Sequence, residues 1–379
     1  MFAIINGKVF NGDIFLHGKC VVVKNNEILN IINEDELDER FPDIKKIDAE
    51  NGYITPGFID LQLNGCGGVL FNDSITRETL KIMNKTNLKY GCTSYLPTLI
   101  TTGDKNIISA INLIESMDDK EEVGVLGLHI EGPYISVKKK GIHNADFIRE
   151  LDADMTDVIS KAGGEIVKII TIAPENTKGE YISVLSKSGI KVSLGHTNAT
   201  YKEIEDKKIY GITLATHLFN GMSSFNHREP GAAGAVLDMD ISAGIIVDGF
   251  HVDYAAIRLA HKVMRERLYL VTDAVSPVGT NMEYFYFEGN KVYYKDGKCF
   301  GEDGTLGGSA LTMDVGVKNL VEKVGVSLEE AIRMATLYPA KAISVEDRYG
   351  KLQPGHIADI VILNKNIQVE KVFSKGKLI

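Results

Sequence analysis

The chain has 379 residues, of which 44% are apolar and 25% are charged, and its formal net charge is −9. This length suits one large domain and a smaller one, and the negative charge argues against a nucleic-acid partner. The sequence has no apolar run long enough for a transmembrane helix, no secretory signal at its start and four scattered cysteines without a CxxC pair. We therefore expect a cytoplasmic protein with reduced thiols and no membrane partner.

Both ends of the chain consist of short β-like runs separated by tight turns. The first, AIINGKVF (3–10), turns at Asn6-Gly7, and CVVVKNNEILNII (20–32) turns at Asn25-Asn26. The closing VFSKGKLI (372–379) has the same rhythm as the opening run. We expect residues 1–54 and 349–379 to form one small β domain.

The middle of the chain, residues 55–348, alternates apolar β-branched runs with stretches of helical period. The eight apolar runs are residues 57–62, 92–98, 124–131, 167–173, 191–196, 213–218, 243–250 and 268–273. Buried parallel strands have continuous apolar sequences, and each needs a helical crossover to the next. The pattern predicts an α/β fold, a TIM-like (β/α)8 barrel. An open doubly wound sheet is the alternative, which the lack of a GxGxxG motif after an early strand disfavours.

An aromatic-rich segment, residues 284–300, follows the eighth predicted strand. It reads as a β-hairpin with turns at residues 288–290 and 296–297. We expect its aromatic face to pack or to mediate dimerisation rather than to catalyse. Two helices are predicted after it, at residues 311–324 and 327–342.

Polar residues suited to metal or proton chemistry stand at the ends of nearly all the predicted barrel strands. A lone histidine in an apolar stretch is more often structural than a ligand. Several at one end of separate strands, however, converge on the place where barrels of this type carry their active sites. In chain order these residues are Gln62, Asn64, His129, Glu131, His196, His217, His251 and Asp273.

The residue types indicate metal-dependent hydrolysis. Glu131, His196 and His217 are two imidazoles and a carboxylate, three protein ligands that leave a coordination position for water, as catalytic divalent sites require. A metal lowers the pKa of its bound water from about 15.7 toward ~7. Asp273 would accept the proton of that water and pass it to the leaving amine.

At these residues the chain resembles the N-acetylglucosamine-6-phosphate deacetylases of the amidohydrolase superfamily, essentially from end to end. The resemblance implies a barrel joined to a β-sandwich built from both chain ends. It also implies hydrolysis of N-acetyl-D-glucosamine 6-phosphate to D-glucosamine 6-phosphate and acetate, in amino-sugar catabolism and cell-wall sugar recycling. The matching segments are PGFIDLQLNGCGG (56–68), HIEGPY (129–134), KKGIHN (139–144), LGHTNATY (194–201), THLFNGM (216–222), REPG (228–231), DGFHVDY (248–254), VTDA (271–274) and GTLGGSALTM (304–313).

The resemblance implies a role for each residue of the site. One divalent metal, Zn²⁺ or Fe²⁺ with Co²⁺ or Mn²⁺ as alternatives, would be held by Glu131, His196 and His217. Asp273 would be the general base and then the general acid, and His143 would polarise the acetyl carbonyl.

The resemblance also implies where the sugar phosphate binds. The phosphate would meet the Asn220-Gly221 turn, His251 and an arginine from the other subunit of a homodimer. Arg228 matches that arginine, with a surface salt bridge as its alternative role. The implied substrate-binding residues are Ile142, His143, Asn220, Gly221, Arg228, His251, Leu306, Gly307 and Gly308.

Gln62 and Asn64 stand where many amidohydrolases carry a His-x-His pair that binds a second metal. Neutral amides are poor ligands for a transition metal compared with imidazole, so we predict a mononuclear site.

Two other functions stay open at this point. One is a cyclic-amide hydrolase or deaminase on the same barrel, which the Asn220-Gly221 and Arg228 set disfavours. The other is a catalytically silent barrel, which the complete ligand set disfavours.

Overall fold

The computed structural model describes residues 1–287 and 289–379. By its internal contacts the chain divides into two compact units. One unit consists of residues 1–60, 87–94 and 313–379, and the other of residues 61–86 and 95–312. None of the described helices combines the length and the apolar character needed to cross a lipid bilayer.

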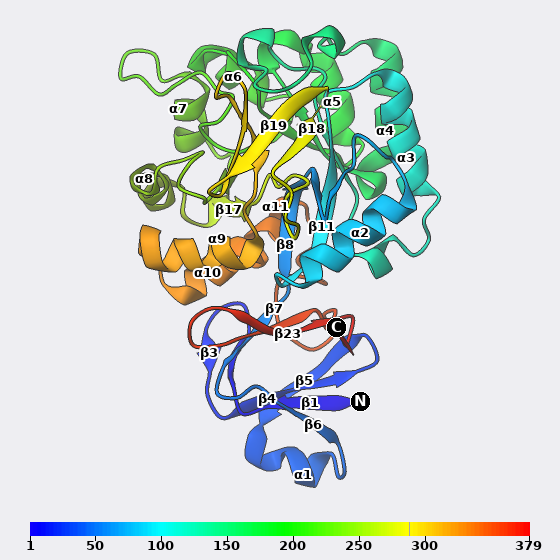
Figure 1. The fold of residues 1–379 in the computed structure, drawn as a ribbon, viewed down its shortest axis with the longest axis vertical. Helices are drawn as coiled ribbons and strands as arrows, with labels where there is room; N and C mark the ends of the chain where they lie inside the picture. Colours follow the sequence, from blue (N-terminus) through cyan, green and yellow to red (C-terminus); the bar gives the residue numbers. More distant parts are fainter. Residues whose placement is uncertain (288) are drawn as a thin grey trace. The chain divides into compact units, whose positions relative to one another are not determined.

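Both ends of the chain contribute strands to the first unit, as the sequence predicts (Figure 1). Apolar side chains from its two sheets, among them Ile4, Val21 and Ile360, share one buried cluster. The first sheet has the strand order β5 (Glu27–Asn33), β4 (Lys19–Lys24), β1 (Phe2–Ile5), β6 (Lys45–Asp48). The second has the order β24 (Lys377–Leu378), β23 (Val369–Ser374), β22 (Ile360–Leu363), β7 (Tyr53–Pro56), β2 (Lys8–Phe10), β3 (Phe15–Leu16).

The two asparagine turns predicted near the N-terminus are confirmed. Asn6 lies between β1 and β2 and has a φ of 55°, and Asn25 lies between β4 and β5 and has a φ of 56°. Asparagine tolerates this left-handed conformation better than most residues, because its short side chain can bond to the local backbone. The turn chemistry therefore sets where these strands end.

A sheet of eight strands confirms the predicted barrel. All neighbouring pairs from β11 to β17 are parallel. Leu63, at the end of β8, forms a parallel bridge with Ala274, just beyond β17, so the two edges of the sheet meet. The strand order is β17 (Leu268–Val271), β16 (Ser242–Ile246), β15 (Ile212–Ala215), β14 (Lys191–Leu194), β13 (Val167–Ile172), β12 (Leu128–Glu131), β11 (Cys92–Ile100), β8 (Phe58–Leu63).

Helices follow the strands as crossover connections, which parallel pairing requires. Helix α6 begins at a capping box: the Thr200 side chain accepts from the backbone of Glu203, whose carboxylate accepts from the backbone of Thr200. The crossover helices are α2 (Arg77–Leu88), α3 (Asp104–Glu115), α4 (Ala153–Ile166), α5 (Gly179–Lys187), α6 (Tyr201–Lys208), α7 (Gly231–Asp238) and α8 (Tyr254–Met264).

A four-stranded antiparallel sheet follows β17, where the sequence predicts a hairpin. The predicted turn at residues 296–297 is confirmed by the pairing of Lys295 with Lys298, whereas Glu288, in the other predicted turn, lies outside the described residues. Phe285 and Phe287 pack into an apolar cluster, so this face of the sheet packs, as expected. The strands are β18 (Tyr284–Phe287), β19 (Asn290–Lys295), β20 (Lys298–Gly301) and β21 (Leu306–Ser309).

The two predicted C-terminal helices are each divided in the structure. The helix expected at residues 327–342 is divided at Thr336, whose φ of −135° and ψ of −75° are not helical. The second piece has Pro339 in its first turn, where a missing backbone N–H is tolerated. The helices are α9 (Met313–Asn319), a π-helical turn at Leu320–Val324, α10 (Leu328–Ala335) and α11 (Leu337–Ala342).

Candidate active site

Glu131, His196 and His217 converge at the C-terminal ends of three barrel strands, β12, β14 and β15. Glu131 is the last residue of β12, and the two histidines lie two residues beyond the ends of β14 and β15. Oε1 of Glu131 lies 3.2 Å from Nε2 of His196 and 3.0 Å from Nε2 of His217. The two Nε2 atoms are 3.1 Å apart. All three side chains are buried, so their polar atoms face one another and not solvent.

Three residues of the site have left-handed backbones that only glycine adopts freely. The φ angles are 47° at His196, 33° at His217 and 52° at Asp273. Such a conformation costs on the order of 1–3 kcal/mol and persists where the surroundings enforce it, often at functional sites. Here the carbonyl of His196 accepts from the Ser136 N–H at 2.8 Å, and that of Asp273 accepts from the Ser309 N–H at 2.8 Å. The backbone is therefore fixed in the conformation that turns these side chains inward.

The donor set fits a divalent metal ion. The carbonyl of Lys139 can only accept, and it lies 2.8 Å from Nδ1 of His196, so this nitrogen carries a proton. With a single proton on the ring, Nε2 of His196 directs a lone pair at the Glu131 carboxylate. Burial raises the pKa of Glu131, but hydrogen bonds and positive charge from His196 and His217 lower it well below its ordinary value, so an anionic Glu131 goes with positive charge in this cluster. Two acceptors that face each other at this distance require a cation or a shared proton between them.

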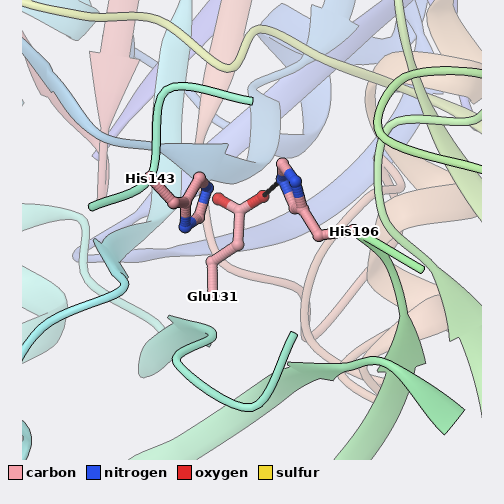
Figure 2. A group of neighbouring side chains, drawn as sticks. All are labelled: Glu131, His143 and His196. Atoms are coloured by element: carbon pink, nitrogen blue, oxygen red, sulfur yellow. Dashed lines mark hydrogen bonds and ion pairs between the residues drawn. The ribbon is translucent and has the colours of Figure 1, made fainter. Parts of the chain in front are cut away.

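His143 is a second neighbour of the Glu131 carboxylate. It lies in the loop after β12, and the ligand atoms of Glu131, His143 and His196 all lie within 4.8 Å of one another, which would also allow a metal on these three (Figure 2). Its Nδ1 is 2.7 Å from Oγ1 of Thr101, and burial holds the pKa of His143 well below its ordinary value. His143 is thus a neutral ring whose Nε2 is available to a metal or to a substrate.

Asp273 is held by the two amides at the second-metal position. Asn64 Nδ2 donates to its Oδ1 at 2.6 Å, and Gln62 Nε2 donates to the same oxygen at 3.2 Å. Gln62 Nε2 also lies 3.1 Å from each oxygen of Glu131. Burial, together with the negative charge of Glu131, raises the pKa of Asp273 to about 6. The amide groups therefore direct N–H donors at the carboxylates, and Asp273 has proton affinity suited to general acid–base catalysis.

Most of the predicted substrate-binding residues line one pocket of about 270 Å³ together with this cluster. Gly307 is not among the lining residues, and a Cβ there would meet Cδ1 of Ile142 at 2.6 Å. Arg228 is exposed in the loop between β15 and α7 and does not line the pocket of its own chain. The predicted residues in the lining are Asn64, Glu131, Ile142, His143, His196, His217, Asn220, Gly221, His251, Asp273, Leu306 and Gly308.

One of the strand-end histidines has a structural role instead. His129 is buried, with Nε2 2.7 Å from Oγ1 of Thr171 and Nδ1 3.1 Å from the carbonyl of Leu61. Burial lowers the pKa of His129 to about 4, so the ring is neutral. It ties three barrel strands together in the layer beneath the pocket.

Two residues that the sequence analysis did not assign support the site. Thr101 bonds to His143, and Asp248 contacts His251 with a distance of 2.7 Å between Oδ2 and Nδ1. Asp248 could have been found by its spacing, since an aspartate three residues before a histidine in a short loop is within reach of the ring. Thr101 gave no such signal, because it is far from His143 in sequence.

Comparisons with known proteins identify the class. Residues 53–379 match the amidohydrolase family. The chain is 44% identical to an N-acetylglucosamine-6-phosphate deacetylase of Haemophilus influenzae, over 99% of this chain and 98% of that protein. The crystal structure of N-acetylglucosamine-6-phosphate deacetylase from Pasteurella multocida has a TM-score of 0.97 and 42% identity, and covers 100% of this chain and 99% of that one.

A further similar structure contains a bound ligand. It is a variant of the Mycobacterium smegmatis N-acetyl-D-glucosamine-6-phosphate deacetylase in complex with N-acetyl-D-glucosamine-6-phosphate. Its TM-score is 0.90 at 25% identity, covering 100% of this chain and 98% of that one. This chain therefore belongs to the amidohydrolase family and, within it, to the N-acetylglucosamine-6-phosphate deacetylases.

Proposed function

We propose that this chain hydrolyses the amide bond of N-acetyl-D-glucosamine 6-phosphate to give D-glucosamine 6-phosphate and acetate. One observation carries the proposal: a carboxylate, two imidazoles and a buried aspartate meet in one pocket of a chain that is similar over its full length to enzymes named for this reaction. The reaction belongs to amino-sugar catabolism and cell-wall sugar recycling.

One divalent metal per chain is held by Glu131, His196 and His217. Their facing oxygen and nitrogen atoms, 3.0 to 3.2 Å apart, support this set over one that includes His143. Zn²⁺ and Fe²⁺ suit two imidazoles and a carboxylate, as do Co²⁺ and Mn²⁺. When bound, such an ion makes water acidic enough to serve as a nucleophile at neutral pH and polarises a carbonyl oxygen.

The protein's own groups carry the protons and the charge. Asp273 accepts a proton from the attacking water and delivers it to the sugar nitrogen, because an amine anion is a very poor leaving group. His143, through Nε2–H, donates to the acetyl oxygen and stabilises the negative charge that develops there. Ile100, Ile142 and Leu306 line the same pocket and suit the acetyl methyl, the substrate's main apolar group.

A second subunit completes the binding site for the substrate's phosphate. Asn220, Gly221 and His251 line the pocket, but its described lining includes no lysine or arginine. A phosphate needs cationic or charge-assisted donors. Arg228, exposed on its own chain, supplies one to the neighbouring pocket of a homodimer.

The proposal also covers the location of the protein and the limits of its domains. The protein acts in the cytoplasm, which the buried cysteines and the absence of a CxxC pair support. Residues 1–54 and 349–379 form the β-sandwich domain, and residues 55–348 form the barrel domain.

The decisive experiment is acetate release from N-acetylglucosamine 6-phosphate after chelation and after add-back of Zn²⁺, Fe²⁺, Co²⁺ or Mn²⁺ singly. We expect chelation to abolish turnover and at least one ion to restore it, with about one ion bound per chain. N-acetylglucosamine and a cyclic amide serve as comparison substrates. Activity that survives complete metal removal, or a preference for the cyclic amide, would reject the proposal.

A further inference from the structure

His251 lines the pocket, and Asp248 contacts its ring. Oδ2 of Asp248 lies 2.7 Å from Nδ1 of His251, and the two side chains are only 7% and 8% exposed. The other oxygen, Oδ1, accepts from the backbone N–H groups of Phe250 and His251, both at 2.8 Å. The carboxylate is therefore fixed by its own loop before it contacts the ring.

This contact determines which atom of His251 a ligand meets. A carboxylate accepts hydrogen bonds, so Nδ1 carries a proton and Nε2 is the ring atom left for the pocket. A phosphate that contacts Nε2 would extend this contact into one chain, from the phosphate through the ring to Asp248.

Other titratable groups lie near the pair. Burial raises the pKa of Asp248, but its hydrogen bonds with His251 lower that pKa by more. The pKa of Asp248 therefore lies below its ordinary value. Asp273 lies close enough to His251 for an electrostatic interaction and adds negative potential. Burial raises the pKa of Cys299 to about 12 and raises that of Tyr254, so both are neutral. Nζ of Lys298 lies over the Phe250 ring, 4.6 Å from its centre, so this positive charge is in contact with the aromatic side chain next to His251.

We propose that Asp248 is a positioning residue for the substrate's phosphate: it anchors Nδ1 of His251 and so leaves Nε2 for the pocket. His251 is then the side chain that each chain supplies to the phosphate in its own site, alongside Arg228 of the partner. The inference rests on the proposed deacetylase function, in which His251 binds the phosphate.

The variant Asp248→Asn tests the contact with Nδ1. The amide oxygen can still accept from the two backbone N–H groups, while the amide NH2, which cannot accept from an Nδ1–H, replaces the oxygen that faces His251. We expect KM for N-acetylglucosamine 6-phosphate to rise about tenfold with little change in kcat, and KM for N-acetylglucosamine to stay the same. Asp253→Asn is the matched control: Asp253 caps α8 by accepting from the Ala255 N–H, and asparagine caps equally well.

A double-mutant cycle separates positioning from a general structural role. If Asp248 acts through His251, the double variant Asp248→Asn/His251→Asn should have the same KM as His251→Asn alone. Additive effects, or a KM for Asp248→Asn within twofold of the parent, would overturn the inference while leaving the deacetylase function intact. A parent protein that releases no acetate with any metal would instead overturn the proposed function and this inference with it. Thermal unfolding identifies any variant that has lost its fold. In that case, calorimetry compares the binding of glucosamine 6-phosphate by His251→Asn and by the double variant: equal affinities support the inference, and a further loss in the double variant overturns it.

Discussion

His217 and His143 are both close enough to Glu131 to be the further metal ligand beside it. His217 has Nε2 within 3.0 Å of the carboxylate, whereas His143 is anchored through Nδ1 to Thr101 and is held neutral by burial. A neutral ring with an available Nε2–H is a suitable donor to a carbonyl oxygen. The geometry thus favours His217 as a ligand and His143 as the group that polarises the substrate.

Substitution of each histidine by glutamine distinguishes the two roles. We expect His217→Gln to lose most of its bound metal and its activity, since an amide is a poor ligand. We expect His143→Gln to keep about one metal per chain and to lose turnover by a factor of about 10²–10³, the usual cost of removing an oxyanion donor. Metal analysis beside acetate-release kinetics checks both. Loss of metal from His143→Gln with retention by His217→Gln would reverse the assignment.

Asp273 is expected to be needed for proton transfer and not for assembly of the site. Asp273→Asn should retain its metal and its fold, because asparagine can still accept from Asn64 and Gln62. Turnover should fall by a factor of about 10²–10⁴, the contribution typical of general acid–base catalysis. Parallel metal analysis, thermal unfolding and kinetics test this, and near-normal turnover would remove Asp273 from the mechanism.

At the scale of elements, the inserted sheet contributes Phe287, Leu306 and Gly308 to the lining of the pocket. The Val275 N–H donates to the carbonyl of Ser309 at 3.0 Å, and the Ser309 N–H donates to that of Asp273 at 2.8 Å. This short ladder ties β21 directly to the segment that carries Asp273. Leu306 and Gly308 therefore line the pocket because β21 is bonded beside Asp273.

Gly308→Ala should disturb this connection. Gly308 has a φ of 70°, and a Cβ there would meet Cγ1 of Val275 at 2.5 Å and the carbonyl oxygen of Asp273 at 3.2 Å. Small displacements of catalytic groups are costly, so we expect kcat/KM to fall about tenfold or more. Gly304→Ala is the matched control, because it has a φ of 81° but no atom within 4 Å of the added Cβ.

Both substitutions place a Cβ on a left-handed backbone, which costs about 1 kcal/mol. Thermal unfolding should therefore show a loss of stability in each. Kinetics should separate them, with Gly304→Ala within about twofold of the parent. Equal losses of activity in the two variants would mean that backbone strain, and not the contact with Val275 and Asp273, is responsible.

At the scale of the whole molecule, the described lining of the pocket lacks an arginine or lysine for its anionic substrate. Arg228 lies in the loop between β15 and α7 with its side chain exposed. We expect Arg228→Ala to raise KM for the phosphorylated sugar about tenfold or more, and KM for N-acetylglucosamine by much less. His227→Ala, the exposed neighbour, serves as the control.

A mixing experiment tests whether Arg228 acts on the partner's pocket. Subunits with Arg228→Ala and subunits with Asp273→Asn are each impaired alone. A mixed dimer contains one pocket with an intact Asp273 that receives Arg228 from the other subunit, so low-KM activity should reappear after subunit exchange. A monomer in solution, or no recovery on mixing, would contradict action between subunits.

Much of this architecture can be predicted from the sequence because it depends on local patterns. Continuous apolar runs separated by helical periods predicted all eight barrel strands, and the asparagine turns predicted the β strands near the N-terminus. Short-range chemistry sets both features, so neighbouring residues suffice to reveal them. The ends of strands also indicated Glu131, His196 and His217 as one cluster.

Other features depend on contacts between distant segments, which no local pattern contains. His129 and Glu131 share a strand, yet only Glu131 reaches the pocket, because the barrel interior is layered and His129 bonds to Thr171 and Leu61 in the layer beneath. The left-handed backbones at His196 and Asp273, and the amide donors that hold Asp273, exist only once the strands have closed into a barrel. Residue types and their order therefore establish the chemistry available to this protein, while the tertiary fold establishes which of those residues act together, since convergence requires segments far apart in the chain to meet.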